Sequence, residues 1–340
     1  MDGKTIAVVV IGRNEGERLK YCLRSIPDNI PAVYVDSGST DGSVAYARSI
    51  GVTVLELEMS IGFTAARARN VGWRHVVSDH SYNAKFIQFI DGDCELDKAW
   101  LDKATQEIHD DPKLAVVFGR RRERFPARSI YNRICDDEWN VPIGLVASCG
   151  GDALFLVAAL QSVGGYCDDL IAGEEPDLCL RLGRLGWYVR RVDAEMTLHD
   201  ANIIYFKSWW RRAKRGGFAY AAHALKHGDR SNPQWLHQLR SIMVWGFIWP
   251  IGGLIFATFW GFWNPLGGIA LMAAILGSYA AQVLRIAARK HSSGSTRRFA
   301  IQYSLLMMIG KFAAFSGIIL CWVSRLLNRR VKLIEYKQST

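Results

Sequence analysis

Acidic residues are nearly absent from the second part of the chain. Residues 200–340 hold 3 Asp and Glu against 19 Lys and Arg, whereas residues 1–199 hold 29 against 23. The net charge of +10 therefore hides a mildly acidic front and a strongly basic back. The basic residues flank apolar segments and form no recognisable nucleic-acid motif, so we expect anionic membrane lipids as a partner and no nucleic acid.

Metal-type cysteine patterns are also missing. The seven cysteines include no CxxC pair, so we expect free thiols in a reducing compartment. The first apolar run, residues 6–11, is too short for a secretory signal and has no cleavage pattern after it. We therefore expect the front part to stay in the cytoplasm.

Short β-prone runs alternate with helical patterns over the first 200 residues. Strands are predicted at residues 6–11, 32–35, 52–57, 86–91, 114–119 and 187–192. Helices are predicted at residues 17–26, 43–50, 62–77, 98–109, 153–163 and 172–185. This alternation predicts an α/β domain with a mostly parallel sheet, whose ligand loops lie along one edge.

The strand predicted at residues 86–91 ends at two carboxylates separated by one glycine, Asp91-Gly92-Asp93. Two such acids can share a hard divalent cation, which would in turn hold a diphosphate. A solvated turn after a strand is the alternative.

Two other charged segments have two interpretations each. For the run from Arg120 to Arg124 we favour a solvated charged segment over part of an entrance for an anionic substrate. Glu174, Glu175 and Asp177 open a helix, where acids either stabilise the helix end or take part in chemistry.

The basic part of the chain has the pattern of a membrane protein. Residues 203–225 mix aromatic and basic side chains, which is typical of an interfacial helix. Residues 241–263 and 266–284 carry no charge and are joined by Asn264-Pro265, which predicts a transmembrane hairpin. Close contact between its helices is expected at four glycines, namely Gly252, Gly253, Gly267 and Gly268.

A third apolar segment, residues 299–327, contains Lys311 beside Gly310 and has basic residues on both sides. By the positive-inside rule, we expect both of its ends in the cytoplasm. We favour a re-entrant or interface-lying segment broken at Gly310, with a third full span as the alternative. The predicted domains are residues 1–200 (catalytic), 201–239 (interfacial helices), 240–286 (hairpin) and 287–340 (basic loop, third segment and tail).

Five pieces of the first 200 residues, taken in order, resemble family 2 glycosyltransferases of the GT-A fold. They are Ile11-Gly12-Arg13-Asn14-Glu15, Val35-Asp36-Ser37-Gly38-Ser39-Thr40-Asp41-Gly42, the Arg-Asn-x-Gly segment within residues 66–72, Asp91-Gly92-Asp93, and Gly173-Glu174-Glu175-Pro176-Asp177-Leu178. The chain departs from the usual pattern at Gly12 and Arg13, at Ser37, and at Glu175, which replaces an Asp.

The resemblance implies a GT-A catalytic domain that performs an inverting hexosyltransferase-type reaction with a nucleoside diphosphate sugar and Mn²⁺ or Mg²⁺. It implies Glu175 as the catalytic base, with Glu174 as second candidate, and Asp91, Asp93 and His199 as metal ligands. The implied donor-binding residues are Asn14, Glu15, Asp36, Ser37, Arg67, Asn70, Asp91 and Gly151. The implied acceptor or diphosphate contacts are Trp139, Arg211, Arg212 and Arg215.

We expect a lipid-linked or cell-envelope glycan acceptor, and a multi-pass protein of the inner membrane with its catalytic domain on the cytoplasmic side. Residues 207–212 lack the Gln of the Gln-x-x-Arg-Trp motif of processive synthases, which predicts a single addition. A polyprenyl-phosphate glycosyltransferase and a non-catalytic scaffold that binds a nucleotide sugar are the alternatives. The resemblance says nothing of oligomeric state.

Overall fold

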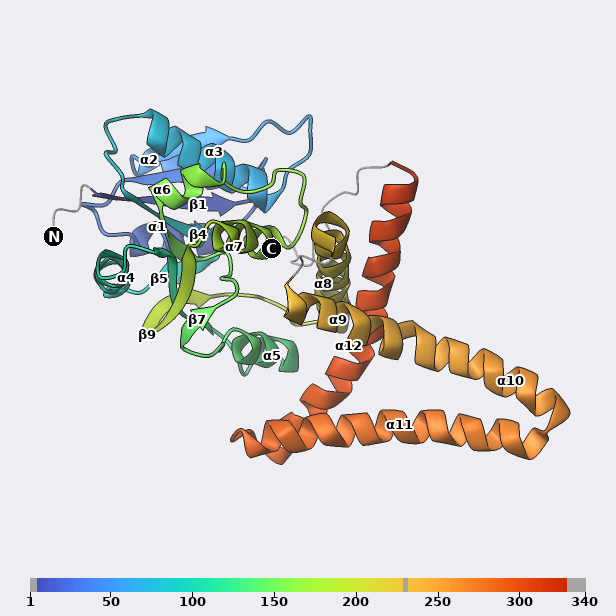
Figure 1. The fold of residues 1–340 in the computed structure, drawn as a ribbon. Coiled ribbons are helices and arrows are strands. Elements are labelled where there is room, and N and C mark those ends of the chain that lie inside the picture. The colour runs from blue at the N-terminus through green and yellow to red at the C-terminus, as the bar shows by residue number, and fades with distance from the viewer. Residues whose placement is uncertain (1–4, 229–231, 329–340) are drawn as a thin grey trace. The chain divides into compact units, whose positions relative to one another are not determined.

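The computed structural model describes residues 5–228 and 232–328 and divides the chain into two compact units, one up to Tyr205 and one from Phe206. In the first unit, a mixed sheet is flanked by helices (Figure 1). Its strands are β1 (Ile6–Gly12), β2 (Ala32–Asp36), β3 (Thr53–Glu56), β4 (Phe86–Asp91), β5 (Cys94–Leu96), β6 (Leu114–Glu123), β7 (Gly144–Val146), β8 (Ala153–Leu156) and β9 (Tyr188–His199). Its helices are α1 (Glu17–Ser25), α2 (Ser43–Ser49), α3 (Ala65–Ser78), α4 (Trp100–His109), α5 (Ile130–Glu138), α6 (Val157–Ser162) and α7 (Glu174–Arg184).

The strand order is β3-β2-β1-β4-β8-β6-β9-β5, with β7 paired to β9 outside this path. Strands β3, β2, β1 and β4 are mutually parallel, and β6 is parallel to β9. Because β8 runs antiparallel to both β4 and β6, the two parallel groups point the same way. Their carboxyl ends therefore meet at one edge of the sheet, as the alternation predicted.

Two local predictions were wrong. Residues 153–156 form strand β8 instead of the start of a helix, because their backbone pairs with β4 and β6 on both sides. The run from Arg120 is only partly solvated: β6 continues to Glu123, Arg120 and Glu123 are buried, and Arg122 is exposed. Arg120 pairs with Asp136 at 2.8 Å.

The second unit consists of helices α8 (Phe206–His227), α9 (Pro233–Met243), η3 (Val244–Gly252), α10 (Gly253–Trp263), α11 (Pro265–Ser292) and α12 (Arg297–Leu326). Helices α9, η3 and α10 form one continuous helix, Pro233–Trp263, with a π-helical stretch around Pro250. This helix, α11 and α12 are each long and apolar enough to cross a membrane. Helix α12 is continuous through Gly310, so the expected break there is absent from the described chain.

The Asn264-Pro265 turn is confirmed, with the Asn264 side chain accepting a hydrogen bond from the Gly267 amide. A Cβ at Gly268 would lie 2.6 Å from the Gly261 Cα, and one at Gly253 would lie 2.7 Å from Ile275. A Cβ at Gly267 would lie 2.5 Å from the Trp260 indole. Apart from the neighbouring turns of its own helix, no described atom lies within 4 Å of the Cβ position at Gly252, so the close contacts do not include that glycine.

Gly72 lets α3 pack tightly against the sheet. A Cβ there would overlap Val9 of β1 and lie 3.1 Å from a methyl group of Val35 in β2.

We predict that Gly72→Ala lowers the free energy of unfolding by about 1–3 kcal/mol, the usual cost of overpacking. Thermal unfolding in detergent measures this. Gly183→Ala in α7, where no described atom lies within 4 Å of the Cβ position, should leave the melting temperature unchanged or raise it. Equal melting temperatures for the parent and Gly72→Ala would contradict the packing argument.

Candidate active site

The edge of the sheet formed by the parallel strands gathers polar side chains from distant parts of the sequence. Asp36 ends β2, Asp91 ends β4, Glu123 ends β6 and His199 ends β9. Register places Asp91 beside Ile11 of β1, and Glu123 beside His199. Strand pairing alone therefore brings these positions close together at this edge.

A buried arginine, Arg69 of α3, joins the two predicted halves of the site. One guanidinium nitrogen, Nη2, lies 3.0 Å from Asp91 Oδ1. The other, Nη1, lies 3.1 Å from Oε1 of both Glu174 and Glu175. The Arg69 side chain is only 3% exposed. The predicted donor end and the predicted base therefore belong to one ion-pair cluster.

Gly151 leaves the space that this arginine needs. A Cβ at Gly151 would overlap the Arg69 guanidinium and lie 3.1 Å from a carboxylate oxygen of Asp91. Gly151 thus lies beside the cluster, and its contact with a donor stays a prediction.

Arg67 was predicted to bind the donor, whereas the structure places Arg69 in the cluster. Arg67 donates instead to the backbone oxygens of Glu58 and Gly62, and so holds residues 58–62. Two signals identify Arg69: it is the arginine that directly precedes Asn70, and it lies on the same helical face as the buried Ala66 and Trp73.

Asn70 is fully engaged with the protein. Its amide nitrogen donates to the Tyr166 carbonyl and to Asp168, and its oxygen accepts from the Tyr166 amide and the Trp73 indole. In this structure it ties α3 to the segment before α7, and its assignment to donor binding stays a prediction.

A second arginine, Arg121, approaches Asp91 from β6. Its Nη2 lies 3.1 Å from Asp91 Oδ2, and its Nε lies 3.4 Å from Asp152 Oδ2. Asp152 was not singled out from the sequence, yet its side chain is fully buried. It accepts from the Asp91 amide at 3.0 Å and from the Thr197 hydroxyl at 2.8 Å.

Asp93 and His199 form a candidate metal pair. His199 Nε2 lies 3.1 Å from Asp93 Oδ2, and both side chains are buried. Burial, followed by the charge of Arg121, lowers the pKa of His199, so its imidazole is neutral near pH 7, the form that binds metals. Cys94 Sγ lies within 4.8 Å of the same ligand atoms, but burial raises the pKa of this thiol and keeps it protonated.

The other ring nitrogen of His199, Nδ1, faces a carboxylate. Glu123 Oε2 lies 3.8 Å from it. Metal-bound histidines commonly direct their second nitrogen at such a group, which fixes the tautomer and the orientation of the ring. The donor set and its support therefore fit a divalent cation at Asp93 and His199.

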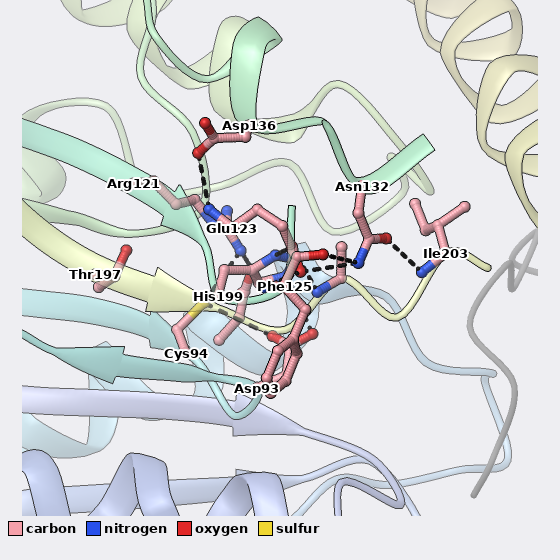
Figure 2. Close-up of polar contacts among 12 residues, drawn as sticks. Asp93, Cys94, Arg121, Glu123, Phe125, Asn132, Asp136, Thr197, His199 and Ile203 are labelled. Carbon is pink, nitrogen blue, oxygen red and sulfur yellow. Dashed lines mark hydrogen bonds and ion pairs between the residues drawn. The ribbon is translucent and has the colours of Figure 1, made fainter. Parts of the chain in front are cut away.

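Glu123 is itself held on all sides (Figure 2). Its Oε1 accepts from the Phe125 amide at 3.1 Å and from Asn132 Nδ2 at 3.0 Å, and its Oε2 accepts from the Ala201 amide at 3.0 Å. Asn132 in turn accepts from the Ile203 amide at 2.9 Å. This network fixes the segment that follows His199.

Asp36 and Asn14 shape the predicted nucleoside loop. Asp36 accepts from the Tyr34 hydroxyl at 2.7 Å and from the amides of Gly38 and Ser39 at 2.9 and 2.8 Å. Asn14 has a positive φ of 54°. Its backbone amide donates to the Ser39 hydroxyl, and its side-chain oxygen accepts from the backbone amide of Thr40.

Two further predicted donor residues lie beside this loop. Ser37 is buried, and Glu15 pairs with Arg18 at 2.8 Å. A direct contact of any of these four residues with a nucleoside stays a prediction.

Glu175 has the properties expected of a base. It lies in the first turn of α7, after Gly173 at a φ of 83°. Its side chain is 16% exposed, whereas that of Glu174 is 4% exposed. Burial, reinforced by the charge of Glu174 and opposed by Arg69, raises the pKa of Glu175 to about 7.

The predicted acceptor contacts fall in different units. The Trp139 ring lies edge-on to His199 with centroids 4.7 Å apart, and the Arg121 guanidinium lies 5.0 Å from its centroid. Arg211, Arg212 and Arg215 belong to α8 of the second unit, and their role stays a prediction.

Residues 7–144 match the family model described as Glycosyl transferase family 2. Relatives described as pre-mycofactocin glycosyltransferase, from two strains of Mycobacterium tuberculosis, are 25% identical over 244 residues, which is 68% of this chain and 50% of theirs. The chain thus spans about half the length of these curated relatives.

A solved structure has a similar fold. The mannosyltransferase PcManGT from Pyrobaculum calidifontis, in complex with GDP-Man and Mn²⁺, superposes with a TM-score of 0.57 at 19% identity. The match covers 92% of this chain and 86% of that one. Fold and family match agree: residues 7–144 match family 2 glycosyltransferases, and the first unit has a GT-A-like fold, followed by three apolar helices that could cross a membrane.

Proposed function

We propose that this protein is a membrane-attached inverting glycosyltransferase that moves one sugar from a nucleoside diphosphate sugar to an acceptor hydroxyl. The observation that carries the proposal is the buried Arg69, which connects Asp91 to Glu174 and Glu175 within about one hydrogen-bond length on each side. A donor-binding end and a base within one cluster are what such a transfer needs.

The charge balance of the cluster favours a divalent cation. Asp91, Asp93, Asp152, Glu174 and Glu175 bring five carboxyl groups together, and Arg69 and Arg121 neutralise only part of that charge. Mn²⁺ or Mg²⁺ held by Asp93 and His199, with Asp91 nearby, would stabilise the negative charge that develops on the departing diphosphate. The complex of PcManGT with GDP-Man and Mn²⁺ supports a nucleotide sugar as donor.

Glu175 is the proposed base, because an acceptor hydroxyl must lose its proton as it attacks the sugar. Its carboxylate is more accessible than that of Glu174, and a pKa of about 7 suits proton transfer at neutral pH. Arg69 orients the carboxylate and keeps part of it ionised.

We place the acceptor in the membrane. The apolar helices and the basic helix α8 suit a lipid-linked or cell-envelope glycan, with the catalytic domain on the cytoplasmic side. The missing Gln near Trp209 and Trp210 favours a single addition.

We predict that Asp93→Ala abolishes divalent-dependent turnover, because the carboxylate at His199 Nε2 is removed. Release of nucleoside diphosphate, measured over a Mn²⁺ or Mg²⁺ titration with a panel of nucleotide sugars, tests this. Asp110→Ala, at an exposed carboxylate, is the control. Full activity of the parent in chelator would rule out a metal role.

We predict that Glu123→Gln weakens Mn²⁺ affinity by about 10–100-fold, the usual effect of losing a carboxylate that orients a metal-binding histidine. Calorimetric Mn²⁺ titration of the protein without donor measures this apart from activity. Asn132→Ala removes a hydrogen bond from the same carboxylate but keeps its charge, so its affinity should fall less. Equal losses in both variants would mean that Glu123 only supports the fold.

We predict that Glu175→Gln lowers turnover by about 10²–10⁴-fold while donor affinity persists, because a general base is lost. In the parent, turnover should rise as pH increases through about 7, since Glu175 becomes ionised there. The variant should lack this rise.

A dead Glu174→Gln beside an active Glu175→Gln would assign the base to Glu174. Undiminished transfer by Glu175→Gln to polyprenyl phosphate, an acceptor that needs no base, would favour the polyprenyl-phosphate alternative. Donor binding without turnover on any acceptor would favour a scaffold.

A further inference from the structure

Helix α12 is apolar on two opposite faces. One face is buried within the second unit, at positions that include Phe299, Ala313, Ala314, Ile318 and Cys321. The other face is exposed at a spacing of three, four or seven residues, through Ile301, Leu305, Ile309, Phe312, Ile319, Trp322 and Leu326. A stripe of this length needs an apolar cover.

The buried face packs against a basic helix. A Cβ at Gly217 of α8 would overlap the backbone of Ala314, and a Cβ at Gly317 would overlap the backbone of Lys214. Helix α8 also carries exposed Lys207 and Arg211. Charged side chains are costly at the centre of a bilayer. Because α8 carries such side chains and packs against α12, we expect this part of α12 to lie away from the bilayer centre.

The contacts between α12 and the hairpin also place the middle of α12 near the membrane surface. Gly246 would place a Cβ 2.6 Å from the Lys311 carbonyl oxygen, and Tyr279 stacks on Phe312 with centroids 6.3 Å apart. Gly246 follows Arg240 by six residues, and Tyr279 precedes Arg285 by six. At 1.5 Å per residue, both contacts lie about 9 Å from the charged end of the hairpin.

If α12 crossed the bilayer, the midpoint of α12 would contact the hairpin at a greater depth. Lys311 and Phe312 are the midpoint of α12, and the midpoint of a helix that crosses a core of about 30 Å lies about 15 Å from either surface. The observed contact is shallower. In addition, Lys311 Nζ lies 3.4 Å from Oε1 of Gln238, which precedes even Arg240 in the chain. Figure 1 shows α12 running steeply across the hairpin and not alongside it.

Both ends of α12 are basic. Arg297 and Arg298 lie in its first turn and Arg325 in its last, and the sequence continues with Arg329 and Arg330. If α12 crossed the bilayer, one of these clusters would lie on the side that the positive-inside rule disfavours.

We infer that α12 lies in the plane of the membrane interface, with α8 on its aqueous side and its exposed stripe in the acyl region of an anionic phospholipid bilayer. A helix at this position buries its apolar face about 5–10 Å deep, which matches the depth of the contacts with the hairpin. Only the hairpin of Pro233–Trp263 and α11 then crosses the bilayer. The turn between α11 and α12 and the C-terminal end of α12, at Arg325, then lie on the same side of the bilayer. This inference does not depend on the proposed reaction.

Cysteine accessibility in the full-length protein tests it. Cys167, the native cysteine that is not buried, is changed to Ser. Single reactive cysteines are then introduced by Trp263→Cys at the hairpin tip, by Ser293→Cys after α11, and by a cysteine added after Thr340. Sealed membrane vesicles are treated with a membrane-impermeant maleimide before and after permeabilisation, and size-exclusion profiles in detergent check folding.

We expect the sites at Ser293 and after Thr340 to label together, and the site at Trp263 to label from the opposite side. Labelling of the Thr340 site together with the Trp263 site would show that α12 spans the bilayer and would overturn the inference. Labelling of all three sites from one side would also overturn it, because the hairpin would then not cross.

Discussion

The arrangement of the first unit depends on one buried cation. Arg69 is almost inaccessible to solvent and contacts three carboxylates from two distant segments, Asp91 and the Glu174–Glu175 pair. A buried charge is tolerated only when it is paired and hydrogen-bonded, so the arginine and the acids require one another. Removing one partner of a buried pair commonly costs about 3–5 kcal/mol. The end of β4 and the start of α7 are thereby held together.

The backbone prepares this arrangement. Parallel pairing aligns the carboxyl ends of β1, β2, β4, β6 and β9, while the antiparallel β8 brings its amino end, with Gly151 and Asp152, to the same edge. Gly72 lets α3 approach β1 closely enough to present Arg69 to Asp91. The acids at the strand ends are therefore positioned by strand register, and the arginines then balance part of the charge gathered at this edge.

Much of this could be read from the sequence, for a physical reason. Buried parallel strands are nearly continuous apolar runs, so residues 6–11 and 86–91 and the Asp91-Gly92-Asp93 turn stood out. The sequence was less informative where tertiary pairing decides the structure. Residues 153–156 are a strand only because β4 and β6 flank them. Glu123 looked like one charge among several, and only its place beside His199 in β6 and β9 shows why it is buried.

The placement of Arg69 also links the two halves of the proposed chemistry. The charge of Asp91 raises the pKa of Glu175, and the charge of Arg69 lowers it. A positive charge placed beside Asp91 would offset the effect of Asp91 on this pKa, and would therefore favour the ionised form of Glu175. The same charge stabilises a diphosphate, because both effects are Coulombic and act over a short distance in a poorly solvated site. In the proposed reaction, donor loading beside Asp91 and ionisation of Glu175 would therefore be coupled by charge, with Arg69 contacting both carboxylates.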